Sequence, residues 1–61
     1  MGMTLEDLKN HYDTRIQETE HSIMFYLKRN TDGRFSRIIE FYRGRLWLFR
    51  VFRRQLEELE T

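Results

Sequence analysis

The chain has 61 residues, no cysteine, no proline and a formal net charge of +1. A chain of this length can form only one domain, taken as residues 1–61, and its core must be small. The absence of cysteine excludes disulfides and thiolate metal sites as sources of stability, so we expect association with a second copy instead. The longest apolar run, 46–49, is far shorter than the roughly 20 residues of a membrane span. We therefore expect no transmembrane segment and a cytoplasmic protein.

A first helix is predicted over about residues 4–29, because apolar residues recur there at steps of three and four. Thr4 is a suitable N-cap, and Asp7 three residues later completes a weak capping-box pattern. The recurring residues are Leu5, Leu8, Tyr12, Ile16, Thr19, Ile23 and Leu27. Their repeat is closer to about 11 residues than to seven, which predicts a nearly straight helix.

A turn is predicted at 30–33, where Asn-Thr-Asp-Gly forms the one strong cluster of turn residues. A second helix follows over about residues 34–60, and the absence of proline leaves both helices uninterrupted. Its apolar residues fall on a and d positions of a heptad, with Arg45 as the one polar exception. They are Phe35, Ile38, Tyr42, Phe49, Phe52, Leu56 and Leu59.

The short turn predicts an antiparallel two-helix hairpin, so the expected fold class is all-α. Facing residues should have numbers that sum to about 64, and this rule sets apolar residues against apolar ones through most of the length. The same rule brings acids of the first helix to bases of the second, since acids dominate residues 1–27 and bases residues 28–54. The predicted cross-helix pairs are Glu20 with Arg45, Asp13 with Arg50 and Arg53, and Lys9 with Glu57.

The apolar arc of the second helix spans about 180° on a helical wheel, whereas that of the first spans about 100°. One narrow helix cannot cover the wider arc, so one flank of the second helix should remain exposed. That flank is Phe41, Leu48, Phe52 and Leu59, or else Ile39 and Leu46. We interpret the first set as the interface of a homodimer, in which two hairpins form a four-helix bundle with the second helices at its centre. The alternative is a monomer whose second helix tilts and uses its full width.

The outward face of the second helix carries Arg43, Trp47, Arg50 and Arg54, which lie within about 60° of one another. Tryptophan and arginine dominate many protein interfaces, so the leading interpretation is a partner-binding face for an unidentified host or viral protein. Nucleic acid is an alternative, with arginines on phosphates and the indole on a base. A third interpretation is a surface tryptophan packed beneath arginine stems. Glu40 on the same face weakens the nucleic-acid interpretation.

No set of residues in the sequence is typical of an active site. His11 and His21 would point about 80° apart on a helix, which is a poor arrangement for zinc ligands. The sequence has neither a glycine-rich phosphate loop nor a nucleophile elbow. We therefore expect no enzymatic activity, no metal and no cofactor. Binding of the basic, amphipathic second helix to a membrane surface ranks third among the functions, because its apolar arc already has a partner in the first helix.

The opening segment 3–8 (Met-Thr-Leu-Glu-Asp-Leu), the size of the chain and its single turn resemble small accessory proteins encoded in the early regions of temperate phages. Plasmid regulators built as dimeric helical hairpins are similar in architecture. The resemblance implies a protein that modulates host replication, transcription or the choice between lysis and lysogeny by binding. It assigns no role to any individual residue.

Overall fold

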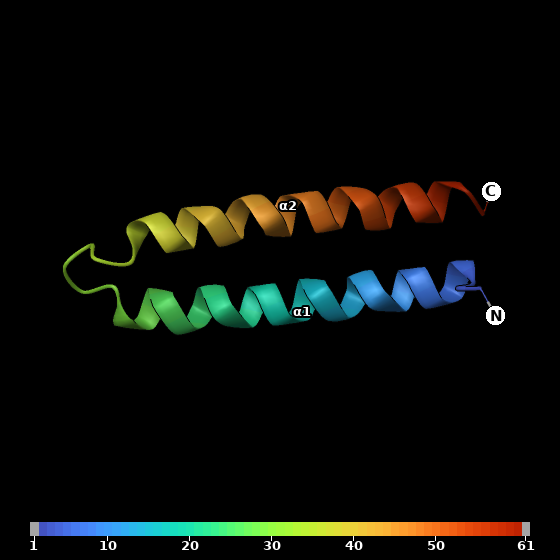
Figure 1. The fold of residues 1–61 in the computed structure, drawn as a ribbon. Coiled ribbons are helices and arrows are strands. Elements are labelled where there is room, and N and C mark those ends of the chain that lie inside the picture. The colour runs from blue at the N-terminus through green and yellow to red at the C-terminus, as the bar shows by residue number, and fades with distance from the viewer. Residues whose placement is uncertain (1, 61) are drawn as a thin grey trace.

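Two long helices, α1 (Leu5–Arg29) and α2 (Ser36–Glu58), run antiparallel and are joined by one tight connection (Figure 1). This computed structural model describes residues 2–60, and no strand occurs among them. The molecule is elongated, with principal-axis extents of 46 × 20 × 14 Å, and the start of α1 lies at the same end as the end of α2. The prediction of an all-α helical hairpin is confirmed.

A capping box begins α1. Thr4 has an extended backbone, and its Oγ1 accepts a hydrogen bond from the Asp7 backbone N–H at 3.1 Å. The Asp7 carboxylate in turn accepts a hydrogen bond from the Thr4 backbone N–H at 3.2 Å. Acidic Glu6 in the first turn and basic Lys28 and Arg29 in the last turn complement the helix dipole. The predicted capping box is confirmed, and it satisfies backbone groups that the helix itself cannot pair.

The connection between the helices turns at Gly33, whose φ of +82° strongly favours glycine. The Asn30 side chain stabilises the turn through two hydrogen bonds. Its Oδ1 accepts a hydrogen bond from the Phe35 backbone N–H at 2.9 Å, and its Nδ2 donates to Ser36 Oγ at 3.3 Å. Because the turn extends through Phe35, α2 begins at Ser36 and not at the predicted residue 34.

The helices face each other along positions spaced alternately by four and three residues, as in a left-handed coiled coil. In α1 these positions are Leu5, Lys9, Tyr12, Ile16, Thr19, Ile23 and Tyr26, and from the turn onward they are Phe35, Ile39, Tyr42, Leu46, Phe49, Arg53 and Leu56. All of them are buried or half-buried. Among the apolar residues that the structure describes, however, only Ile23 and Ile39 are buried, with exposed fractions of 8% and 5%. The hairpin therefore has a thin core.

The repeat along α1 is seven residues, and the predicted 11-residue recurrence is wrong. Leu27 is 43% exposed, and Tyr26 occupies the inner position instead. The Tyr26 ring packs against Phe35 and Tyr42, with ring centroids 5.3 and 6.0 Å away. A seven-residue period keeps position 26 facing α2, whereas position 27 rotates outward.

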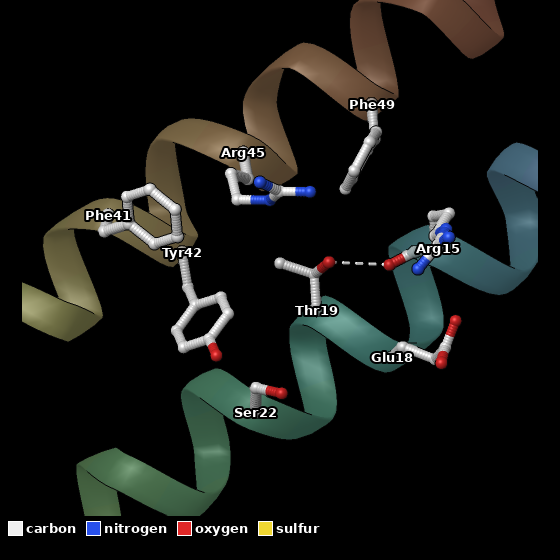
Figure 2. Close-up of a pocket in the computed structure, with 8 residues that line it drawn as sticks. All are labelled: Arg15, Glu18, Thr19, Ser22, Phe41, Tyr42, Arg45 and Phe49. Carbon is white, nitrogen blue, oxygen red and sulfur yellow. Dashed lines mark hydrogen bonds between the residues drawn. The ribbon is translucent and has the colours of Figure 1, made fainter.

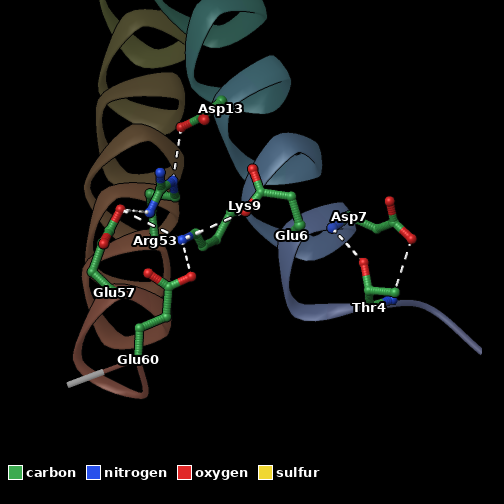
Figure 3. A network of polar contacts seen from close by, with 8 residues as sticks. All are labelled: Thr4, Glu6, Asp7, Lys9, Asp13, Arg53, Glu57 and Glu60. Carbon is green, nitrogen blue, oxygen red and sulfur yellow. Dashed lines mark hydrogen bonds and ion pairs between the residues drawn. The ribbon is translucent and has the colours of Figure 1, made fainter.

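An ionic network closes one side of the hairpin near its open end (Figure 3). The buried Lys9 donates a hydrogen bond to Glu60 and lies 4.0 Å from Glu57. Arg53 donates to Asp13 across the hairpin at 2.9 Å and to Glu57 along α2 at 2.7 Å. The hydrogen bond to Glu60 raises the pKa of Lys9, and the hydrogen bond from Arg53 lowers the pKa of Glu57. The predicted Lys9–Glu57 and Asp13–Arg53 pairs are confirmed.

Candidate functional site

Four large apolar side chains on one side of α2 and its C-cap remain exposed, and we call them the apolar row. They are Phe41, Leu48, Phe52 and Leu59, with exposed fractions of 58%, 44%, 40% and 72%. The other flank considered for this role, Ile39 and Leu46, packs toward α1, and Ile39 is only 5% exposed. The hairpin therefore uses one flank of the wide apolar arc and leaves the apolar row, the predicted dimer interface, facing solvent.

Beside the apolar row, an open groove of about 320 Å³ lies between the two helices (Figure 2). Its lining residues are Arg15, Glu18, Thr19, Ser22, Phe41, Tyr42, Arg45 and Phe49. The groove forms because Thr19 and Ser22 are short, so they leave space opposite the aromatic rings of α2. The Thr19 hydroxyl donates to the Arg15 backbone oxygen of its own helix at 2.6 Å and so does not reach across. This groove was not predicted, although short side chains opposite large rings are a sequence signal for unfilled space.

Arg45 lines this groove. Its guanidinium carbon lies 5.5 Å from the Phe41 ring centroid and 5.4 Å from the Phe49 ring centroid. The predicted Glu20–Arg45 ion pair is not formed, because Glu20 accepts a hydrogen bond from Arg50 at 3.0 Å instead. The rotation of each helix about its axis places Glu20 and Arg45 on opposite sides of the hairpin, so their charged groups do not meet. In the part of the chain that the structure describes, Arg45 contacts aromatic rings and no carboxylate.

The outward side of α2 carries a second exposed set, roughly 140° around the helix from the apolar row. Trp47 is 64% exposed, and Arg43, Arg50 and Arg54 are exposed beside it. Arg50 is paired with Glu20, whereas Arg43 and Arg54 make no ion pair with any described residue. We call Arg43, Trp47 and Arg54 the Arg–Trp row. It presents two cationic groups and an indole to solvent.

Residues 2–60 contain no candidate metal-binding cluster and no candidate membrane span. Within that range, no group of three or more histidine, cysteine, aspartate or glutamate side chains could hold a metal ion. Neither α1 nor α2 combines the length and the apolar character that crossing a membrane requires. His11 packs edge-on against the Tyr12 ring at 5.4 Å. The exposed groups of α2 offer apolar contact, cation–π contact and positive charge.

No protein-family model matches the chain, and no curated protein or solved structure matches it either. The resemblance to phage accessory proteins therefore stays a prediction. The fold and its surfaces define a helical hairpin that presents two separate exposed rows on one helix.

Proposed function

We propose that this protein is a non-enzymatic interaction protein, a homodimeric helical hairpin that binds a partner protein of a host or a virus. Its role is that of a small accessory regulator of the phage or plasmid type, acting in the cytoplasm. The observation that carries the proposal is the presence of two separate exposed rows on α2. In this proposal the apolar row serves self-association, and the Arg–Trp row binds the partner.

The amount of exposed surface supports the homodimer. The chain has an accessible surface of 5079 Å² and a mass of 7.7 kDa. A compact monomer of this mass exposes about 4300 Å², so the hairpin exposes roughly 800 Å² more. A standard interface buries about 800 Å² on each partner. Association along the apolar row would remove this excess and would thicken the core of each hairpin.

The chemistry of the Arg–Trp row supports a protein partner with an acidic surface. Tryptophan and arginine are the residues that most often carry the binding energy of interfaces. Trp47 is 64% exposed, and Arg43 and Arg54 lie about one and two helical turns from it. Acidic groups on the partner would pair with the guanidinium groups, while apolar atoms of the partner would cover the indole.

Affinity capture from cells of the source, followed by mass spectrometry, tests the partner-binding part of the proposal. Trp47→Ala is expected to lose the captured partner, and Arg43→Ala is expected to weaken binding by roughly tenfold. Gln17→Ala, which changes an exposed residue of α1, is the matched control and should retain the partner. Equal capture by the Trp47→Ala variant and the unaltered chain would show that the Arg–Trp row is not the binding face.

Light scattering tests the homodimer separately. The expected mass is twice the chain mass of 7.7 kDa. A mass of one chain at high micromolar concentration would remove the homodimer from the proposal, but it would leave the Arg–Trp row to be judged by the capture experiment.

Nucleic acid is the second candidate for the same row, because Arg43 and Arg54 have no carboxylate partner among residues 2–60. The arginines would contact phosphates, and Trp47 would stack on a base. The exposed Glu40 nearby on α2 opposes phosphate binding. Gel shifts with single- and double-stranded probes decide between the candidates. A shift that disappears steeply with salt supports nucleic acid, and no shift at low salt rejects it.

A further inference from the structure

The exposed side of α2 carries a second regular heptad spacing, separate from the one that faces α1. Alternating steps of four and three residues connect Phe41, Arg45, Leu48, Phe52, Gln55 and Leu59. All six residues are exposed, and four of them are apolar. This is the spacing of a helix that packs along another helix in a coiled coil. Therefore α2 has the periodicity to hold a second helix on this side while α1 occupies the other.

We infer that a second copy of this chain packs antiparallel against this side of α2, about a two-fold axis that passes between Leu48 and Phe52. The inference rests on the homodimer of the proposed function and specifies its geometry. The facing pairs between the two copies are Phe41 with Leu59, Leu48 with Phe52, and Arg45 with Gln55. Apolar residues therefore meet apolar residues, and the two polar positions meet each other.

The alternative registers match less well. A parallel pair in register sets Arg45 against Arg45, which brings like charges together inside an apolar contact. An antiparallel pair displaced by one heptad either sets Arg45 against Leu48 or leaves Phe41 beyond the end of α2 in the second copy. The symmetric antiparallel register satisfies all six positions in both copies, as an isologous interface requires.

In this register, Leu59 of the second copy can pack into the groove between α1 and α2. At 72%, Leu59 has the highest exposed fraction of the large apolar side chains in the described chain. In the antiparallel register, Leu59 of the second copy lies against Phe41, which lines the groove of about 320 Å³. The short side chains of Thr19 and Ser22 keep this space open. The groove and the protruding leucine are therefore complementary, and each copy supplies one of each.

A polar pair points to the same occupant. Arg45 lines the groove, and Gln55 of the second copy lies opposite it in the antiparallel register. The Arg45 guanidinium already lies over the Phe41 ring. From that position it can donate a hydrogen bond to the Gln55 side-chain oxygen of the second copy. The polar pair thus favours this register over displaced ones.

Disulfide mapping tests the register, because the chain contains no cysteine of its own. Phe41→Cys and Leu59→Cys are prepared as separate chains. An oxidised mixture of the two is expected to form a covalent heterodimer, while each chain oxidised alone forms none. Trp47→Cys, on the outward side of α2, is the control and should not cross-link. A register other than the antiparallel one is indicated if the mixture fails to cross-link, or if both single variants cross-link to themselves.

A charge exchange gives a second test that leaves the apolar contacts intact. Arg45→Glu is expected to weaken self-association on the order of tenfold, and adding Gln55→Arg should restore it. Circular dichroism verifies that each variant remains helical. A double variant that associates no better than Arg45→Glu alone would overturn the Arg45–Gln55 pairing.

Light scattering of the unaltered chain distinguishes failure of the homodimer from failure of the antiparallel register. A monomer overturns the homodimer itself. A dimer that shows neither the mixed disulfide nor the restored association overturns the antiparallel register alone.

Discussion

Lys9 of α1 donates a hydrogen bond to Glu60, and this contact closes the open end of the hairpin. The lysine stem is buried at an inner position of α1, while its ammonium group also faces Glu6 and Glu57. The hydrogen bond to Glu60 is the largest cause that raises the Lys9 pKa above its ordinary value of 10.5. The charged form of Lys9 is therefore favoured in the folded chain.

This relationship predicts a loss of stability in alkaline solution. The stability that Lys9 contributes is fully present below pH 10.5 and is lost as the pH rises through the higher pKa of the folded chain. Thermal unfolding followed by circular dichroism should show Tm falling in that range. Lys9→Met should reduce the alkaline loss and lower Tm at neutral pH, because the contacts of the ammonium group with Glu57 and Glu60 are lost. Lys28→Met changes an exposed lysine and should keep the loss. Equal alkaline curves for Lys9→Met and Lys28→Met would contradict the assignment.

Glu57 predicts the opposite dependence in acid. The hydrogen bond from Arg53, followed by the charge of Lys9, lowers the Glu57 pKa below its ordinary value of 4.5. Its contribution is present above pH 4.5 and is lost as the pH falls through the lower pKa of the folded chain. Glu57→Gln should lower Tm at neutral pH and flatten the decline in acid. Glu40→Gln, at an exposed position without these contacts, is the control. An unchanged acid profile in Glu57→Gln would argue against this role.

The two glycines of the described helices and turn should respond to alanine with opposite signs. Gly33 has a φ of +82°, so Gly33→Ala should lower the free energy of unfolding by about 1–2 kcal/mol. A Cβ at Gly44 would have no atom within 4 Å, and Gly44→Ala should raise the free energy of unfolding by about 1 kcal/mol through helix propensity. Urea unfolding at low protein concentration measures both changes. A destabilised Gly44→Ala hairpin would mean that another chain already lies close to this position.

Substitutions in the apolar row should separate folding from self-association. Phe41→Asp and Leu48→Asp are each expected to weaken the dimer by more than tenfold, because burial of one such side chain contributes roughly 1.5–3 kcal/mol. The helical content should persist, since both side chains are already more than two-fifths exposed in the hairpin. Trp47→Asp on the outward side is the matched control. If sedimentation or light scattering shows the dimer mass for all three variants, the dimer contact lies elsewhere.

Sequence alone determined the hairpin, its turn and the start of α1. The Thr4–Asp7 capping box and the left-handed Gly33 act over a few residues, so their effects do not depend on distant packing. The distribution of acids and bases also identified the partners in the Asp13–Arg53 and Lys9–Glu57 contacts. The widths of the two apolar arcs further indicated that α2 carries more apolar surface than α1 can cover.

Tertiary structure decided which part of that surface is covered. The apolar arc of α2 is wide enough to allow several rotations about the helix axis, and its sequence does not distinguish them. Packing turns Ile39 inward and leaves Phe52 and Leu59 exposed. The same rotation places Arg50, and not Arg45, within reach of Glu20. The choice depends on the sum of contacts along the whole interface, because no single residue or local pattern determines how two helices rotate against each other.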